Sequence, residues 1–349
     1  MGVVVILARL AIFLNRLWFG LLSLPGFSLL DQLLYGVPAS ATASLEDIPQ
    51  SFAEASSTSP PSTAWSHSFI TTNGIRLHIV SAGPQDAPLM LCVHGFPECW
   101  YSWRHQLVEF SSEYRVVAVD MRGYNTSAKP ARRTDYAVNN LVNDLKGIIT
   151  GLGYQKCTLV AHDWGGGVAW HALYSIPQHL ERVIIMNAPH PVNIIHALAN
   201  NEEQIKASWY IFAFQIPFFP EIMVRKFIPS LFYDSLKNPL DFTTQDNNEY
   251  IRSMSQPGSP TASINWYRNM LAPSALPPRA AKISIPTLLI WGQDDDALLQ
   301  SLTIGTERHF SSPNLFSLKL VPSASHWVAQ DQPELVTHFM RAFLNKKIA

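Results

Sequence analysis

The chain has 349 residues, a formal net charge of −1 at pH 7, and 47% hydrophobic against 15% charged residues. The near-neutral charge without a basic run excludes nucleic acid as a partner, and the hydrophobic content predicts a large buried core. The three cysteines and 12 histidines show no spacing typical of a metal site or a disulfide framework. We therefore expect no metal, no cofactor and no disulfides.

The amino-terminal segment is almost entirely apolar up to residue 30, and the first acidic residue is Asp31. Such a stretch predicts a membrane anchor or a signal segment over residues 1–36. Arg9 and Arg16 are costly near the centre of a bilayer, but they lie seven residues apart and share one helical face, which also suits a helix in the membrane interface. We therefore expect membrane attachment through this segment.

Residues 37–65 are rich in Ser, Thr, Ala and Pro, a composition that predicts a linker. The small residues at 39–41 also permit cleavage of a signal peptide, and the acid-poor, Arg-containing start permits a transit peptide. These alternatives lead to a secreted or an organellar protein instead of an anchored one, and the sequence leaves the choice open.

From residue 66 onward, strand-like apolar runs alternate with helical stretches. The predicted strands cover residues 75–81, 89–93, 116–120, 158–161, 183–187, 288–291 and 316–321. This alternation predicts an α/β fold with a doubly wound, mostly parallel sheet whose functional site lies at the carboxyl ends of the strands.

Between two parts of this core, residues 191–282 lose the strand rhythm and become aromatic and helical in pattern. They are predicted to form a helical lid inserted between core residues 66–190 and 283–349. A lid with many bulky aromatic side chains suits a lipophilic substrate, although the same side chains also serve to hold the lid on the core.

The loop after the strand at residues 89–93 is predicted to supply a backbone donor. Gly95 allows close approach of the backbone, and the N–H of Phe96 is the candidate donor for an oxyanion. Pro97 rigidifies the turn, and a cis Phe96–Pro97 bond is one way in which it does so. His94 is predicted to be a structural hydrogen-bonding residue beneath the loop.

The apolar run of residues 159–167 ends at Asp163, which has Ala161 two residues before it and Gly165 two residues after it. A strand that turns sharply into a helix needs small residues at these two positions and presents the residue between them as a nucleophile. A carboxylate that attacks a saturated carbon gives an alkyl ester that water can later split. Asp163 is therefore the candidate nucleophile, and the N–H of Trp164 is a second candidate oxyanion donor.

A base for water and an acid to orient it follow in the expected order. The strand at residues 288–291 runs into Asp294, Asp295 and Asp296, and any of the three can serve as the acid. His326 lies on a loop just beyond the strand at residues 316–321, where a histidine is well placed to face a cleft. It is the candidate base.

These residues together resemble the epoxide hydrolases of the α/β-hydrolase superfamily, especially the membrane-associated animal group. The resemblance spans residues 66–345 and rests on residues 94–98, 120–124 and 162–166 and on the neighbourhoods of Trp291 and His326. One departure is Asn125, where the family usually has glycine. Because asparagine tolerates a left-handed backbone, we interpret it as a tolerated turn substitution.

The resemblance implies several site assignments. The family pattern selects Asp295 as the orienting acid, and the two matching lid segments assign Tyr210 and Tyr267 as donors to the epoxide oxygen. Trp103 and Phe214 are the expected substrate contacts. The family also implies an endoplasmic reticulum location and a role in lipid metabolism or detoxification.

An aspartate nucleophile is shared with haloalkane and fluoroacetate dehalogenases. Phe96 stands where many haloalkane dehalogenases carry asparagine, and Trp164 stands where fluoroacetate dehalogenases usually carry arginine. A ring-opened epoxide oxygen also needs a proton, which a tyrosine can give. We therefore predict hydrolysis of lipophilic epoxides to vicinal diols, with water as the second substrate. A haloalkane dehalogenase and a non-catalytic ligand-binding protein stay as alternatives, and the sequence does not define the oligomeric state.

Overall fold

The computed structural model describes residues 27–38, 65–238, 242–272, 276–277 and 281–346, together with residues 6, 10, 11 and 14, without the side chains of residues 28 and 227–233. Most of the predicted anchor and linker, and the predicted cleavage site at residues 39–41, lie outside the described residues. Among the described residues, no helix is both long enough and apolar enough to span a bilayer.

Eight strands form one sheet in the described part of the chain, in the order β1-β2-β4-β3-β5-β6-β7-β8. The strands are β1 (Ser66–Thr72), β2 (Ile75–Ala82), β3 (Leu89–Val93), β4 (Arg115–Val119), β5 (Cys157–His162), β6 (Leu180–Met186), β7 (Thr287–Gly292) and β8 (Phe316–Val321). Pairing is antiparallel from β1 to β2 and from β2 to β4, and parallel elsewhere. The predicted mostly parallel sheet is confirmed, with each predicted strand matched to within three residues at either end.

Strand β1 was not predicted from the sequence. Its sequence is largely polar and most of its residues are exposed or half-buried, because it forms the edge of the sheet. An edge strand that buries little apolar surface lacks the hydrophobic signal from which the other strands were predicted.

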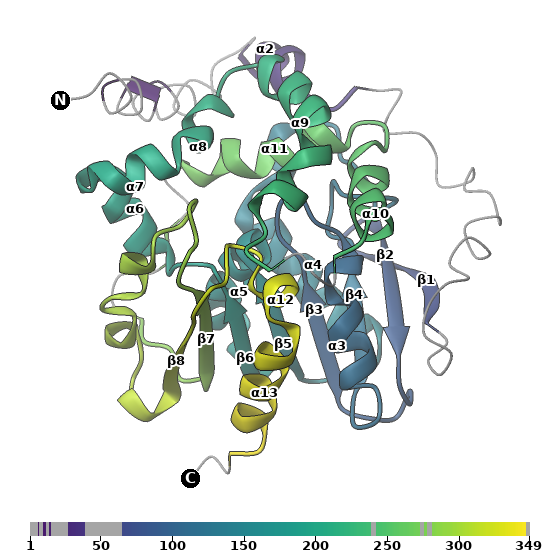
Figure 1. Ribbon diagram of the computed structural model, residues 1–349. Helices are drawn as coiled ribbons and strands as arrows, with labels where there is room; N and C mark the ends of the chain where they lie inside the picture. The colour runs from purple at the N-terminus through teal and green to yellow at the C-terminus, as the bar shows by residue number, and fades with distance from the viewer. Residues whose placement is uncertain are drawn as a thin grey trace.

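Helices cover both faces of the sheet and one of its ends (Figure 1). Their bounds are α2 (Phe27–Tyr35), α3 (Arg104–Glu109), α4 (Val138–Gly151), α5 (Asp163–Ser175), α6 (Pro191–Asn200), α7 (Glu202–Ala207), α8 (Trp209–Ala213), α9 (Phe219–Ser235), α10 (Thr244–Met254), α11 (Ser259–Met270), α12 (Val328–Asp331) and α13 (Pro333–Leu344). Helices α6 to α11 come between β6 and β7 in the chain and lie together above the sheet in Figure 1.

Two apolar cores lie on opposite faces of the sheet. Leu91 and Val93 of β3 belong to the core under α4 and α5, whereas the alternating residues Met90 and Cys92 belong to the core under α3 and α13. This alternation follows from the two-residue period of a strand. Both faces are therefore buried, as expected for a parallel sheet in an α/β fold.

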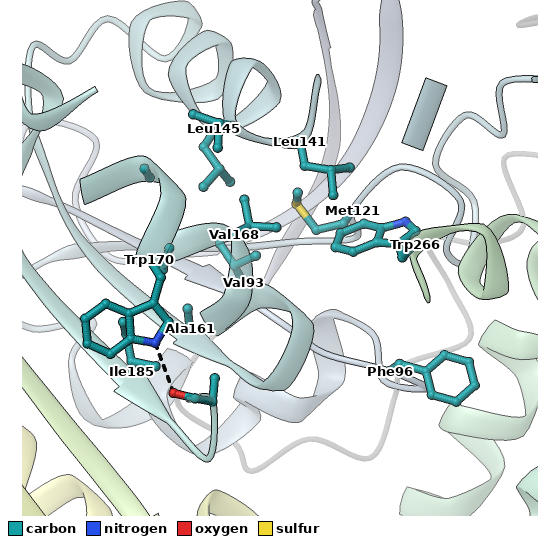
Figure 2. Packing of buried hydrophobic residues seen from close by; sticks show 14 of the residues in the cluster. Val93, Phe96, Met121, Leu141, Leu145, Ala161, Val168, Trp170, Ile185 and Trp266 are labelled. Carbon is teal, nitrogen blue, oxygen red and sulfur yellow. Dashed lines mark hydrogen bonds between the residues drawn. The ribbon is translucent and has the colours of Figure 1, made fainter. Parts of the chain in front are cut away.

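Figure 2 shows how the first core continues from the sheet toward the lid. Val93, Ala161 and Ile185 of three neighbouring strands pack against Val168 and Trp170 of α5. The indole of Trp170 donates to the carbonyl of Ala188 at 3.0 Å, which satisfies its buried N–H. The same core reaches Phe96 and Trp266 beside the lid, so the packing that stabilises the sheet also supports the site.

Helix α2 packs on the folded core, although it belongs to the segment predicted as an anchor. Asp31 is buried and pairs with Arg133 at 2.7 Å. The backbone N–H of Val37, which is also buried, donates to the carbonyl of Ala131 at 2.9 Å. The last part of the predicted anchor therefore docks on the folded core, because the single acid in this helix is neutralised there by a buried arginine.

Candidate active site

The candidate nucleophile lies at the turn between β5 and α5. Asp163 is the first residue of α5 and adopts a left-handed backbone with φ of +47°, a strained conformation that clusters at functional sites. The surrounding glycines leave room for this turn. A Cβ atom on Gly165 would lie 2.3 Å from the carbonyl oxygen of Val93, and one on Gly95 would lie 2.4 Å from the Cβ of Asp163. Steric contact therefore requires the small residues that the sequence shows here.

The loop after β3 holds one of the two predicted donors against this aspartate. The N–H of Phe96 donates to Oδ1 of Asp163 at 2.8 Å, and the Phe96–Pro97 peptide is cis as expected. His94 supports the loop from below, since its Nε2 accepts from the N–H of Met121 at 3.1 Å. The N–H of Trp164 belongs to the first turn of α5, whose amides have no partner within the helix.

The candidate base and its acid meet the same aspartate. Nε2 of His326 lies 3.3 Å from Oδ2 of Asp163, and Nδ1 of His326 lies 2.7 Å from Oδ2 of Asp295. Of the three acids left open by the residue pattern, Asp295 is therefore the one in contact with the histidine. Asp294 and Asp296 are exposed, and Asp296 pairs with Lys237 at 3.0 Å.

The two carboxylates beside His326 favour a charged imidazole while Asp163 is ionised. Burial by itself lowers the pKa of His326, but the carboxylates of Asp295 and Asp163 outweigh burial and raise that pKa well above its usual range. Burial likewise works to raise the pKa of Asp295, yet His326 and donors such as the amide of Asn187 hold it below its ordinary value. The acid thus stays ionised and orients the imidazole.

A buried Glu98–His162 pair joins the two loops of the site, and we assigned it no role from the sequence. Nδ1 of His162 lies 2.6 Å from Oε2 of Glu98, and its Nε2 lies 2.8 Å from the carbonyl oxygen of His326. Oε2 of Glu98 also accepts the N–H of Gly95 at 2.8 Å. Although burial alone raises the pKa of Glu98, His162 and these donors lower it to about 2. The loop of Phe96 and the loop of His326 therefore share one hydrogen-bonded support.

Asn187 is a second supporting residue that received no role from the sequence. It follows β6 with a left-handed φ of +41°, and its Nδ2 donates to Oδ2 of Asp295 at 2.7 Å. Its Oδ1 accepts the N–H of Gly292 at 3.1 Å. The signal that could have identified Asn187 was its position directly after a strand that lies next to β5 in the sheet. Asn125 also has a left-handed backbone, with φ of +43°, as expected.

The two predicted tyrosines approach the site from different lid helices. Tyr210 lies on α8 and Tyr267 on α11, with ring centroids 5.9 Å apart, and both line one cavity with Asp163. Desolvation raises the pKa of both hydroxyls well above 10, so they stay protonated near neutral pH. The ring of Tyr267 packs edge-on against Trp164 at 4.9 Å and Phe96 at 5.2 Å. Two phenol donors therefore share a cavity with the carboxylate.

The cavity extends from Asp163 along α5 to His171. Its walls are mostly apolar, and none of the described residues that line it is a lysine or an arginine. Burial lowers the pKa of His171 to about 4, so its imidazole is neutral at physiological pH. The cavity fits an uncharged, largely apolar ligand.

The two predicted substrate contacts lie elsewhere. Trp103 is 1% exposed in the second core, beneath the sheet and away from this cavity. Its position corrects the prediction of substrate contact, because the packing around α3 holds the side chain in the core. Phe214 is outside the cavity lining but packs edge-on against Tyr267 at 4.9 Å and Tyr210 at 5.8 Å. It supports the tyrosine rings from behind.

No group of three or more histidine, cysteine, aspartate or glutamate side chains is placed to hold a metal ion in the parts of the chain that the structure describes. The three cysteines are buried free thiols. Cys99, which follows the loop of Phe96, packs in the second core.

A strand–turn–helix aspartate with a histidine base, under a helical insertion, defines an α/β hydrolase. The family model for the α/β hydrolase fold matches residues 88–329. Human epoxide hydrolase 4 is 40% identical over 286 residues, which are 80% of this chain and 78% of that protein. Epoxide hydrolase 2 of Caenorhabditis elegans is 38% identical over 289 residues, 81% of each chain.

A solved structure gives the same result. The Bacillus megaterium epoxide hydrolase in complex with an inhibitor superposes with a TM-score of 0.71 and 34% identity, over 80% of this chain and all of that one. The chain belongs to the epoxide hydrolase family of the α/β hydrolases.

Proposed function

We propose that this hydrolase converts lipophilic epoxides to vicinal diols through an alkyl-enzyme ester on Asp163. The observation that carries the proposal is the meeting of one carboxylate nucleophile with two protonated phenols, Tyr210 and Tyr267, in a single apolar cavity. A serine-type hydrolase needs no such pair of acids, whereas an opening epoxide ring produces an alkoxide that must be protonated.

In the ring-opening step, a carboxylate oxygen of Asp163 forms a bond to one ring carbon from the side opposite the breaking C–O bond. Tyr210 and Tyr267 hydrogen-bond the epoxide oxygen, and one of them gives it a proton and becomes a tyrosinate. The raised pKa of both phenols keeps the proton available until the oxygen becomes strongly basic. The product of this step is a hydroxyalkyl ester of Asp163.

Ester formation then releases the base for the second step. The ester is uncharged, so the pKa of His326 falls when the Asp163 carboxylate disappears. The imidazolium then gives its proton through solvent to the tyrosinate, which restores the phenol and leaves the neutral imidazole as the base. His326 takes one proton from water while the hydroxide attacks the ester carbonyl, and the N–H groups of Phe96 and Trp164 stabilise the oxyanion. Collapse releases the diol oxygen, which takes the proton from His326. The second water proton passes from the reformed Asp163 carboxyl to His326, so the carboxylate and the imidazolium of the free enzyme are both restored.

The substrate class follows from the cavity walls. Because no lysine or arginine lines the described cavity, a carboxylate inside it would lack a counter-ion and would have to stay in water. We therefore propose uncharged lipophilic epoxides, such as esterified epoxidised lipids or hydrophobic xenobiotics, as substrates in lipid metabolism or detoxification.

This function is tested by offering the full chain an aryl epoxide, an epoxy fatty acid, its methyl ester and a haloalkane. We expect diol formation, with the methyl ester turned over at least as fast as the free acid. Tyr210→Phe and Tyr267→Phe should each slow diol formation about 10²-fold or more, whereas Tyr154→Phe, whose hydroxyl bonds the carbonyl of Gln85 outside the cavity, should not. Halide release without diol, unaffected by both lid variants, would instead support a dehalogenase. Silence on all four compounds would favour a ligand-binding protein.

We also propose that the apolar amino-terminal segment attaches the enzyme to a membrane, in the endoplasmic reticulum. The support is its sequence: residues 2–30 contain no acid, and Arg9 and Arg16 are seven residues apart, a spacing that would suit one face of an interfacial helix. After expression of the full chain in animal cells, the protein should stay with the membrane pellet in alkaline carbonate. Release of the intact chain into the supernatant would contradict an integral anchor.

A further inference from the structure

Helix α2 is seated against two buried arginines. Asp31 pairs with Arg133 at 2.7 Å, and the ring of Tyr35 lies 4.8 Å from the guanidinium carbon of Arg133 and 4.8 Å from that of Arg268. Arg133 is 1% exposed and Arg268 is fully buried. Burial lowers the pKa of Arg133, and repulsion by the neighbouring Arg268 lowers it further. Arg268 also pairs with Glu221 of α9 at 2.8 Å. Asp31 and the aromatic face of Tyr35 from α2, together with Glu221, therefore offset the cost of holding two positive charges together.

Arg268 connects the two lid segments that carry the tyrosines. It follows Tyr267 on α11, and its Nε donates to the carbonyl of Phe214 at 2.9 Å. The N–H of Phe214 in turn donates to the carbonyl of Tyr210 at 2.8 Å, at the end of α8. A second guanidinium nitrogen of Arg268 donates to the carbonyl of Ile216 at 2.8 Å. The relative position of Tyr210 and Tyr267 thus depends on Arg268.

Two amides on the same helix complete the attachment. Asn265 donates through Nδ2 to the carbonyl of Tyr35 at 2.8 Å, and Asn269 donates through Nδ2 to the carbonyl of Arg133 at 2.8 Å. They lie one helical turn apart on α11, on either side of Tyr267 in the sequence. In Figure 1, α2 lies beside α9 and α11 at the end of the molecule that carries the lid. One side of α11 is therefore bound to α2 and to the backbone of Arg133, while Tyr267 lines the cavity.

We propose that residues 27–38 are a strap that positions Tyr210 and Tyr267 for ring opening, with Tyr35 and Asp31 as the positioning residues. The inference rests on the proposed epoxide hydrolysis, in which the two phenols act only in the first chemical step. The catalytic unit accordingly includes residues 27–38, and a chain that starts at residue 66 lacks part of it.

The test compares Tyr35→Leu with Tyr35→Phe in the full chain. Leucine removes the aromatic face from both guanidinium groups, whereas phenylalanine keeps it. In rapid-quench single turnovers, Tyr35→Leu should form the alkyl-enzyme ester about tenfold more slowly, with the rate of ester hydrolysis within about twofold of wild type because that step does not use the phenols. Tyr35→Phe should match wild type in both steps. Equal slowing of both steps, a loss of ester amplitude alone, or no slowing of alkylation would overturn the proposal.

A second measurement does not depend on catalysis. Hydrogen–deuterium exchange followed by mass spectrometry should show faster exchange of the α11 amides in Tyr35→Leu than in Tyr35→Phe, with the amides of α5 unchanged. Unchanged exchange in α11 would refute the strap even in an active enzyme. If exchange in α11 is faster in Tyr35→Leu but the wild-type chain forms no ester from any epoxide, the strap is supported and the proposed function is refuted.

Discussion

Asp163→Asn is expected to lower diol formation by about 10⁴-fold or more, the largest effect of any single substitution in this chain. An amide of the same shape keeps the hydrogen bond from the N–H of Phe96 but is a far weaker nucleophile than a carboxylate. Asparagine also tolerates the left-handed backbone at this turn, so the variant should fold. Diol formation and the intact mass of the protein after exposure to substrate are the two measurements.

The matched control for this variant is Asp296→Asn. Asp296 is an exposed acid next to Asp295 and pairs only with the partly exposed Lys237 among the described side chains. A surface pair of this kind contributes little to stability, so activity should stay within about twofold of wild type. Persistent turnover in Asp163→Asn, or a covalent adduct on another residue, would show that Asp163 is not the nucleophile.

His326→Gln is expected to separate the two chemical steps. The variant keeps Asp163, both tyrosines and the backbone donors, so alkylation should proceed, but no base then activates water. Turnover should fall about 10³-fold or more, and the intact protein should gain the mass of one substrate molecule. The adduct should map to a peptide containing Asp163.

The pH dependence of the ester hydrolysis gives an independent check on the same residue. In the ester form burial lowers the pKa of His326, the Asp295 carboxylate still raises it, and Asp163 no longer does. The imidazole of this form loses its proton as the pH rises, so hydrolysis by wild type should increase with pH until this histidine is neutral. His326→Gln should lack this rise. His338→Gln, on the exposed side of α13, should keep it. Failure to trap any adduct in His326→Gln would count against a covalent intermediate.

The elements that carry the reacting groups were predictable because each has a local signature. The apolar run into Asp163 between small residues predicts a sharp strand-to-helix turn, and the observed φ of +47° and the close glycine contacts show why those residues are needed. The loop at His326 follows a strand whose bounds were also predicted. Parallel strands end at one edge of a sheet, so a predicted parallel sheet brings these residues together without knowledge of side-chain contacts.

The residue pattern alone left three acids open, and the choice of Asp295 among them required the tertiary structure. Three successive acids share the same local sequence signal, and only the direction of each side chain separates them. Asp295 faces His326 at 2.7 Å, while its two neighbours are exposed. The residue pattern alone does not identify Tyr210 and Tyr267 either. Only the resemblance to a family distinguished them from the other aromatic residues of the lid.

By itself, then, the sequence determined the α/β fold, the strand order along the chain and the candidate nucleophile and base, because hydrophobic period and turn chemistry act between residues close in the chain. Only the tertiary structure showed which residues outside the reacting groups hold the site and the core together. Glu98 meets His162 across 64 residues, and Trp103 turns into the core instead of the cavity. Asp31 pairs with Arg133 although its segment is predicted as an anchor. Such contacts join elements whose spacing in the chain carries no periodic signal, so burial and charge pairing in the folded molecule select them.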